Sequence, residues 1–261
     1  LQKLMRGLGS ENIDFRLRRR DFSADGKLAG RPWLGLKLAE IKDLDAALVI
    51  GSFLRKEQPL VAQRLRQAAK KFTKVSIVSV GGDDQLIRLH QNFTVSPAHL
   101  VLVVAAIAKA AAYAKGVPAI SGFDGIEPCD KAKAIAQSLI EGEKRHIFLG
   151  NVAEQHPEAA TIHALTQEIA RLTGASFGFL GEAANSLGGY VAGVLPTANG
   201  LNAYEMLVQP RKAYVVLGAE LERDAHNAQL ATTALKQAAF TVVLTPFKDG
   251  AAAETADALL P

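Results

Sequence analysis

The histidines and the single cysteine set the first limits on the chemistry of this chain. None of the six histidines forms H-x-x-x-H or H-E-x-x-H, the spacings that place two imidazoles on one metal along a helix. His156 and His163 are one heptad apart without a carboxylate at ligand spacing, which favours a surface or capping role. Cys129 is the only cysteine, so the chain forms no internal disulfide, tetrathiolate zinc site or four-cysteine iron–sulphur cluster.

Carboxylates and the thiol also lie near apparent element ends. Asp83 and Asp84 are adjacent, and neighbouring side chains on an extended segment point in different directions, so the two form no acid–base pair. We interpret them, and Asp124, as solvated turn residues. Cys129 follows Pro128 at an expected helix start, where the helix dipole can lower a thiol pKa, but an inert structural thiol is the favoured interpretation.

A glycine directly follows the last apolar residue of three buried strand patterns. These are VIGS at residues 49–52, FLGN at 148–151 and VLGA at 216–219. The carboxyl ends of parallel strands line the ligand crevice of open α/β folds, where glycine lets a phosphate approach backbone N–H groups; glycine also simply fits a tight turn. The loop from Gly178 to Gly189 could hold an anion, but the chain contains neither G-x-G-x-x-G nor G-x-x-x-x-G-K-[ST]. The candidate binding residues are Gly51, Ser52, Gly150, Asn151, Asn185 and Ser186.

Positive charge is concentrated at the start of the chain. The 30 lysines and arginines against 26 acids give a net charge of +4, and residues 1–31, with eight basic and four acidic side chains, account for all of it. This distribution excludes a general nucleic-acid footprint. Arg16, Arg18, Arg19 and Arg20 repel one another unless acids from elsewhere meet them, so we expect these arginines to serve docking rather than chemistry.

The elements that must position these residues alternate between short β-branched runs and amphipathic stretches. We expect strands at 47–51, 74–80, 146–149, 213–218, 240–244 and 257–260, and helices at 59–71, 97–115, 128–142, 157–172 and 229–239. Such alternation is typical of α/β folds with mainly parallel sheets. Because the pattern restarts after Gly142, we expect two units, residues 1–142 with a basic N-terminal extension and residues 143–261.

The apolar runs are short for a membrane protein. The longest unbroken one, Leu100–Ala108, has nine residues, and a membrane span needs roughly 20, so we expect no direct membrane insertion. The start of the chain lacks the apolar stretch of a secretory signal, and a single thiol in 261 residues suits a reducing compartment. The chain opens without Met and stops abruptly, which we interpret as a fragment of a longer subunit.

Several segments together resemble a known family. The opening LQKLMRGLGSENIDFRLR resembles a Q-K-x-x-R-x-x-G-x-x-N-x-D segment of the molybdopterin oxidoreductase (formate dehydrogenase-like) superfamily. ALVIGSFLRKEQP, FLGNVAEQHPEA, GEAANSLGG and the closing TADALLP resemble its later segments in the same order. The combination of IDFRLR, IGSFLRKEQP, GNVAEQHP, GEAANSLGGYVAG and QPRKAYVVLGAE is similar to the large iron–sulphur subunits of bacterial NADH:quinone oxidoreductase (respiratory complex I). The resemblance implies two Rossmann-like units.

The departures from the superfamily pattern concern its cofactor. The Cys or selenocysteine that ligates the metal in its molybdenum enzymes aligns with Arg20, and a guanidinium has no lone pair for a metal. Phe53 stands where the G-x-N-P motif has its Asn, and Thr245-Pro246-Phe247 replaces the Asp after the last long strand. Metal ligand and cofactor contacts are lost together, so we expect no metal and no molybdopterin in this chain.

The resemblance implies a catalytically silent scaffold domain in the peripheral arm of NADH:quinone oxidoreductase, whose complex passes electrons from NADH through iron–sulphur clusters to quinone. The enzyme is then the complex, with no activity in this chain alone, and the family's clusters are ligated N-terminal to it. The implied partners are other peripheral-arm subunits, with no nucleic acid, at the cytoplasmic face of the bacterial inner membrane. Two alternatives stay open: a redox domain that binds a pterin or nucleotide at the strand ends, and an α/β protein-interaction module.

Overall fold

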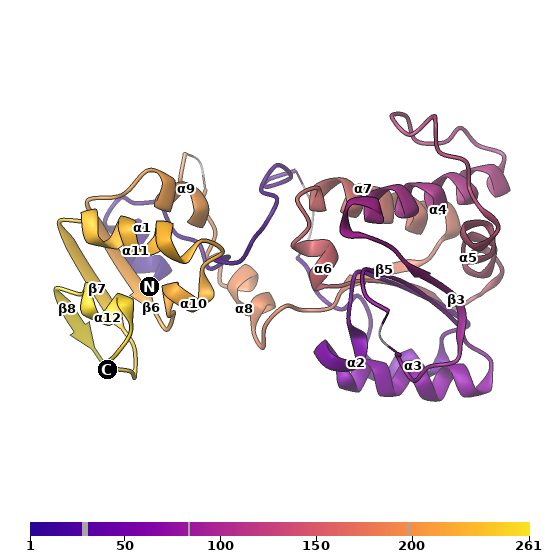
Figure 1. Ribbon diagram of the computed structural model, residues 1–261, viewed down its shortest axis with the longest axis horizontal. Coiled ribbons are helices and arrows are strands. Elements are labelled where there is room, and N and C mark those ends of the chain that lie inside the picture. The colour runs from indigo at the N-terminus through magenta and orange to yellow at the C-terminus, as the bar shows by residue number, and fades with distance from the viewer. Residues whose placement is uncertain (28–30, 83, 198) are drawn as a thin grey trace. The chain divides into compact units, whose positions relative to one another are not determined.

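The computed structural model describes residues 1–27, 31–82, 84–197 and 199–261, and Asp83 lies outside them. The chain forms two compact units. Arg20–Leu187 make the larger unit, and Leu1–Arg19 together with Gly188–Pro261 make the smaller one. Each unit is built on its own parallel sheet, and both sheets can be followed in Figure 1.

The larger unit holds a five-stranded sheet in the order β3-β2-β1-β4-β5, with every neighbouring pair parallel. Its strands are β1 (Ala46–Ile50), β2 (Lys74–Ser79), β3 (Leu89–Thr94), β4 (Arg145–Leu149) and β5 (Ser176–Phe179). The chain adds β2 and β3 on one side of β1 and then β4 and β5 on the other. The strand order therefore reverses between β1 and β4, the switch point at which open α/β sheets bind ligands beyond their carboxyl ends.

Helices cover both faces of this sheet (Figure 1). They are η1 (Leu38–Asp43), α2 (Leu54–Glu57), α3 (Pro59–Lys71), η2 (Pro97–His99), α4 (Leu100–Lys115), α5 (Asp130–Glu141), α6 (Asn151–Glu154) and α7 (Ala159–Thr173). Alternate residues of β1 face the two layers: Leu48 packs in the core cluster of α4, α5 and α7, and Val49 in that of α3 and η1. Because both faces are covered, β1 is buried at every position, as parallel strands generally are.

The smaller unit holds a three-stranded parallel sheet in the order β6-β7-β8. Its strands are β6 (Ala213–Leu217), β7 (Phe240–Leu244) and β8 (Ala258–Leu260), and its helices are α1 (Gln2–Gly7), α9 (Ala203–Val208), α10 (Leu221–Asp224), α11 (Ala228–Gln237) and α12 (Ala251–Glu254). The helix α8 (Ser186–Val191) spans the sequence boundary between the units. Val216 and Val243 of the sheet pack with Ala231 and Leu235 of α11 to form the core.

Buried polar contacts anchor the start of the chain in the smaller unit. The Oδ1 of Asn12 accepts the N–H of Leu201 at 2.8 Å, and the Asp14 carboxylate accepts the N–H of Ala203 at 3.2 Å. The same carboxylate receives two hydrogen bonds from the Arg16 guanidinium, both 2.8 Å long. The opening N-x-D motif therefore joins the first residues of the chain to its last third.

The structure confirms an α/β fold with two parallel sheets, but it divides the chain elsewhere than at Gly142. The strand β4 pairs with β1 from Ala46↔Arg145 to Ile50↔Leu149, so strands from both expected units, 1–142 and 143–261, form one sheet. The pattern restarts there because the chain crosses to the other side of β1 and continues the same sheet. The sequence analysis did not find β3, because its polar sequence LHQNFT is that of a half-exposed edge strand.

The most apolar helix lies inside the larger unit. Among the described residues, one helical segment, Pro97–Lys115, is long and apolar enough to cross a membrane by length and composition. In this structure 61% of its most apolar window is buried inside the protein, and α4 packs against α5 and α7 in the main core. A core helix of this kind passes the same test of length and composition.

The variant Leu65→Ala tests the α3 side of the core. Leu65 is fully buried in the cluster that joins α3 to the sheet, so its truncation should lower the free energy of unfolding by about 2–5 kcal/mol. The matched control is Gln67→Ala at an exposed position of the same helix, which should change that free energy by less than about 0.5 kcal/mol. Urea unfolding followed by circular dichroism measures both, and equal small effects would contradict the packing of α3.

Candidate functional site

The turns that follow β1 and β4 form the candidate site at the switch point. The N–H of Gly51 donates to the Val78 carbonyl and the N–H of Gly150 to the Ile50 carbonyl, both at 2.8 Å. Gly51 has a φ of +65°, a left-handed conformation that glycine adopts without steric cost. The backbone hydrogen bonds of the sheet therefore continue beyond the last strand residues into both turns.

The two turns pack directly on one another. The Gly51 carbonyl accepts the N–H of Val152 at 2.9 Å. A Cβ added at Gly150 would lie 2.5 Å from the Ser52 Cβ and 2.6 Å from the Gly51 carbonyl oxygen, and one added at Gly51 would lie 2.6 Å from the Ala153 nitrogen. Glycine is needed here for the approach of one turn to the other, so no side chain separates the two turns at the switch point.

A carboxylate of the same chain satisfies the donors of the turn after β1. Ser52 is buried, and its hydroxyl donates to the Glu57 Oε2 at 2.8 Å. The N–H of Phe53 donates to the same oxygen at 3.1 Å. Backbone N–H groups at such a strand–turn–helix junction are suited to hold an anion, and here Glu57 of α2 supplies the negative charge. The Phe53 ring packs against Gly81, where an added Cβ would come within 2.5 Å of it.

Four of the six candidate binding residues lie on the turns at the switch point, and the two from the glycine-rich loop do not. Asn151 begins α6, and its Oδ1 is buried without a hydrogen-bond partner. Asn185 is exposed, and the Ser186 hydroxyl accepts the N–H of Ala183 at 3.1 Å. Among the described residues no hydrogen bond joins Asn185 or Ser186 to the turns after β1 and β4.

Two buried titratable groups follow the switch point on α6 and α7. Glu154 and His163 are 9% and 8% exposed, and the Glu154 Oε1 and the His163 Nε2 have no hydrogen-bond partner. Burial raises the pKa of Glu154 to about 8, an effect that the charge of Arg20 opposes and Glu182 reinforces. Burial lowers the pKa of His163 to about 4, and Arg20 lowers it further. At neutral pH both groups are therefore largely uncharged beside a fixed cation.

Of the surface or capping role expected for His156 and His163, the surface position is wrong, because both are buried. His163 stacks on Phe177, with ring centroids 5.3 Å apart. The Nδ1 of His156 accepts the N–H of Glu158, and its Nε2 donates to the Pro97 carbonyl, each at 3.0 Å. His156 therefore braces the turn before α7, a role close to capping, whereas the apolar environment of His163 could not be inferred from its spacing.

The remaining candidate side chains are Cys129, Asp84 and Asp124. Within the described ranges, no group of three or more His, Cys, Asp or Glu side chains is placed to hold a metal ion. Cys129 is a free, exposed thiol. Asp84 and Asp124 are exposed, and Asp124 lies in a turn, as predicted. The Asp84 carboxylate accepts the N–H of Leu86 at 2.8 Å. The sequence analysis missed Glu57 and Glu154, because nothing in their spacing distinguishes them from exposed acids of a helix start.

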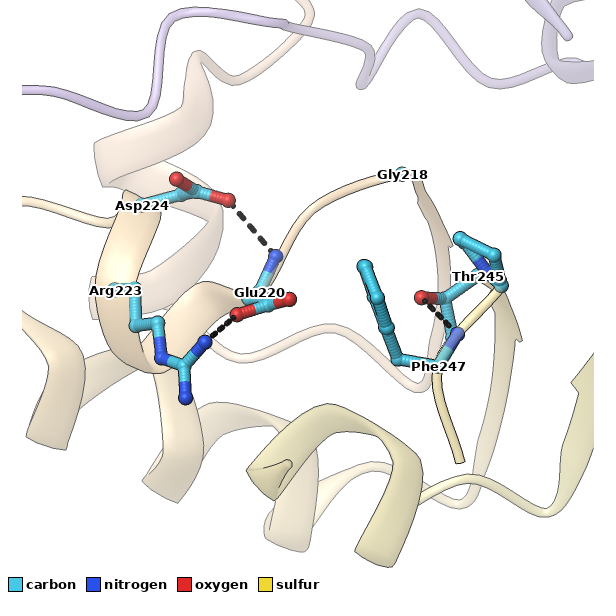
Figure 2. Close-up of a pocket in the computed structure, with 7 residues that line it drawn as sticks. Gly218, Glu220, Arg223, Asp224, Thr245 and Phe247 are labelled. Carbon is cyan, nitrogen blue, oxygen red and sulfur yellow. Dashed lines mark hydrogen bonds and ion pairs between the residues drawn. The ribbon is translucent and has the colours of Figure 1, made fainter. Parts of the chain in front are cut away.

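A cavity of about 510 Å³ lies in the smaller unit at the carboxyl ends of β6 and β7 (Figure 2). Its lining residues are Gly218, Glu220, Arg223, Asp224, Thr245, Pro246 and Phe247. Glu220 accepts a hydrogen bond from Arg223 at 2.6 Å, and Asp224 accepts one from the Glu220 N–H at 2.8 Å. Figure 2 shows the Phe247 ring on the opposite side of the cavity from these acids. The cavity therefore offers an exposed aromatic ring and carboxylates that already have partners.

The arginines of the opening cluster lie in different environments. Arg16 and Asp14 have side chains that are 4% and 0% exposed, so the acid that meets Arg16 belongs to the same unit and Arg16 docks no partner. Arg18 is half-exposed and lies 3.6 Å from Asp224. Arg19 is exposed. Arg20 is the cation whose charge acts on the buried groups Glu154 and His163.

Comparisons with known proteins agree with this architecture. A family model described as molybdopterin oxidoreductase matches residues 1–261. A search of curated proteins finds no match. Among solved structures, the chain is similar to one in the formyltransferase/hydrolase complex of Methylorubrum extorquens, determined in complex with methylofuran, with 16% identity and a TM-score of 0.55. The likeness covers 90% of this chain and 66% of that one, and at this identity it concerns the fold alone.

The variant Gly150→Ala tests whether the turns fill the switch point. The added Cβ would collide with backbone and with Ser52, so we expect a loss of about 1–3 kcal/mol in the free energy of unfolding. Gly125→Ala is the matched control, because an added Cβ there meets nothing within 4 Å; it should change that free energy by less than about 0.5 kcal/mol. Unfolding in urea measures both, and a harmless Gly150→Ala would mean that the turns are apart.

The buried carboxyl of Glu154 predicts a pH dependence of stability. Its pKa is about 8 in the folded protein against an ordinary value of 4.5, so folding becomes less favourable as the pH rises from about 4.5 to 8. Glu154→Gln removes this ionisation. As the pH rises over that range, the free energy of unfolding of the variant should therefore increase relative to that of the wild type, by at most about 1.4 kcal/mol per pH unit.

Thermal unfolding between pH 4.5 and 8.5 measures the difference between the two proteins. His163 has the opposite effect, because its low pKa makes the protein less stable as the pH falls from 6.5 to about 4. This effect is the same in the wild type and in Glu154→Gln, so it cancels in the difference between them. Glu158→Gln, at an exposed carboxyl directly before the start of α7, is the control and should run parallel to the wild type. A parallel curve for Glu154→Gln would contradict the burial of a protonated carboxyl.

Proposed function

We propose a scaffold role for this chain, which belongs to the molybdopterin oxidoreductase family. In this proposal it is a catalytically silent domain of the large iron–sulphur subunit of NADH:quinone oxidoreductase, in the peripheral arm of that complex. The two parallel-sheet units of the family are retained, and their surfaces hold neighbouring parts of the complex in place.

The observation that carries this proposal is the Glu57 carboxylate within the turn after β1. It accepts hydrogen bonds from the Ser52 hydroxyl and the Phe53 N–H. A phosphate-bearing group held by these donors would have to displace this carboxylate. The residues present therefore do not fit the molybdopterin that the family name implies, and we assign no redox step to it.

The position of Arg20 supports the same proposal. In the resemblance Arg20 stands where the molybdenum enzymes have their metal-binding thiolate, and a guanidinium cannot ligate a metal. Its charge acts on Glu154 and His163, which are largely uncharged at neutral pH. These two groups therefore supply no negative charge to balance that of a metal ion beside Arg20, and the positive charge of Arg20 repels a metal ion.

In this proposal the enzymatic activity belongs to the whole complex. NADH oxidation and quinone reduction take place in other subunits, and the iron–sulphur clusters lie in other parts of the subunit and in its neighbours. The partners are the other peripheral-arm subunits, at the cytoplasmic face of the bacterial inner membrane. Arg18 and Arg19 stay in the proposal as docking residues, because they are at least half-exposed, whereas the buried Arg16 does not.

The cavity beyond β6 and β7 favours a second candidate function, the binding of a nucleotide or pterin by a redox domain. Its volume of about 510 Å³ is typical of small-molecule sites, and the exposed ring of Phe247 offers a stacking surface. Against this function, Glu220 and Asp224 already have partners in the cavity wall. A third candidate is an interaction module that has no link to respiration.

Purification of the tagged protein from its own cells in mild detergent tests the proposal. We expect subunits of NADH:quinone oxidoreductase to co-purify. Elemental analysis should find neither molybdenum nor tungsten, and acid oxidation should release no pterin fluorescence. Arg20→Cys should also bind no molybdenum, because Glu57 and the packed turns are unchanged in that variant.

Two other results would contradict the scaffold role. Stoichiometric molybdenum together with pterin would favour the redox domain. Nucleotide that co-purifies with the wild type but not with Phe247→Ala would locate nucleotide binding at the cavity. A preparation that contains no respiratory subunits, but contains other proteins in a constant ratio to this chain, would favour the independent interaction module.

A further inference from the structure

The larger unit carries a concentration of positive charge that its core and its candidate site do not use. Between residues 55 and 74 the sequence has seven basic side chains and one acidic one, whereas the whole chain has a net charge of only +4. This segment comprises most of α2, all of α3 and the start of β2 (Figure 1). We give the name α3 surface to seven exposed residues of this segment: Arg55, Leu60, Arg64, Arg66, Lys70, Lys71 and Phe72.

Five of the cations in this segment have no acidic partner among the residues that the structure describes. Within the described part of the chain no ion pair involves the cations of the α3 surface, namely Arg55, Arg64, Arg66, Lys70 and Lys71. The acidic residue of the segment, Glu57, is engaged by Ser52 and Phe53. Lys74 pairs with Glu141 at 3.0 Å and is therefore outside the surface.

The helix α3 holds the cations in a fixed array. Its apolar side, which includes Leu65, is buried against the sheet, so the opposite side faces solvent. Arg64 and Lys71 lie two turns apart along one flank of this exposed side, and Arg66 and Lys70 lie one turn apart along the other flank. Like charges one turn apart, as at Arg66 and Lys70, disfavour an isolated helix. The fold therefore keeps an arrangement of charge that is unfavourable without an acidic partner.

Large apolar side chains lie at the two ends of the array. Leu60 at the start of α3 is 68% exposed, and Phe72 directly after its end is 60% exposed. The twelve-residue separation corresponds to about 18 Å along the helix axis. Arginine and aromatic side chains are enriched in protein–protein interfaces, with a polar rim around the apolar contacts. The composition and length of the α3 surface match an interface of this kind.

We propose that the α3 surface docks an acidic face of a partner protein, with carboxylates opposite the cations and apolar side chains against Leu60 and Phe72. The inference rests on the proposed function, in which this chain holds neighbouring subunits, and it adds the surface by which one of them is held. Charge complementarity steers the encounter and sets its register. Burial of Leu60 and Phe72 supplies the contact that salt does not weaken.

A protein fits the α3 surface better than a lipid bilayer or a nucleic acid does. A helix that binds in the membrane interface inserts its apolar stripe between the lipids, but the apolar stripe of α3 is in the core of the unit. A phosphate backbone would leave Leu60 and Phe72 uncovered. Basic and acidic side chains are equal in number over residues 32–261, so the rest of that range has a net negative charge, which repels a long polyanion.

Site-specific photo-cross-linking in the cells of origin tests the inference. The cross-linker p-benzoylphenylalanine replaces Gln67, an exposed residue in the middle of α3. It is irradiated in the otherwise unchanged chain, in Arg64→Glu/Arg66→Glu/Lys70→Glu, and in the control Lys3→Glu/Lys115→Glu/Lys248→Glu, which changes the net charge equally at exposed lysines elsewhere. Melting curves establish that each protein is folded. Arg64→Gln/Arg66→Gln/Lys70→Gln replaces the charge reversal if that variant does not fold.

We expect the captured peptide, sequenced by mass spectrometry, to be rich in Asp and Glu. The α3 triple variant should lower the yield at least about tenfold and the control by less than about twofold. In extracts of the same cells, the yield for the otherwise unchanged chain should fall as salt rises from about 0.05 to 0.5 M. Cross-links to lipid or nucleic acid alone, a captured peptide without excess acid, equal yields in the two triple variants, or no product would each overturn the inference.

The outcomes also separate this inference from the proposed function. Capture of an acidic segment from a protein outside NADH:quinone oxidoreductase, lost in the α3 triple variant, would support the docking surface and contradict the proposed function. Co-purification with the respiratory subunits, without any cross-link that depends on the α3 charges, would support the proposed function and overturn the docking surface.

Discussion

The contact between the turns after β1 and β4 fixes what the larger unit can do. Gly150 donates to Ile50 at 2.8 Å and Val152 donates to Gly51 at 2.9 Å, so the two turns are joined by the same kind of hydrogen bond as the strands. A side chain at Gly150 has no space. The two turns are therefore packed against one another at the switch point of the sheet, with no space for a side chain between them.

Closure of the switch point has an electrostatic counterpart. Donors that could hold an anion are met by the Glu57 carboxylate, and the buried groups Glu154 and His163 stay largely uncharged beside Arg20. At the turn after β1, Glu57 thus supplies the negative charge that a bound anion would otherwise supply. The α3 surface is different, because its cations have no acid within the described chain, and that asymmetry is what points to a partner.

Much of the fold could be predicted from local sequence. The helix Pro59–Lys71 and the strand Phe240–Leu244 match their predicted bounds. A proline marks the start of the helix, and Thr245-Pro246 follows the β-branched run of the strand. The division into units could not be predicted, because local sequence does not say on which side of β1 the strand Arg145–Leu149 pairs. At the site, Gly51, Ser52 and Gly150 follow from strand ends, but the role of Glu57 depends on a side-chain direction that spacing leaves open.

Amide hydrogen exchange at Gly150 and Val152 is the most direct test of the closed switch point. Both N–H groups donate to backbone carbonyls of the neighbouring strand and turn. The closed arrangement therefore predicts exchange as slow as that of Phe148 in the middle of β4, since such amides exchange only when the unit opens. Exchange as fast as that of Gly125 in an exposed turn would show that the turns separate readily, and would contradict a switch point that excludes a cofactor.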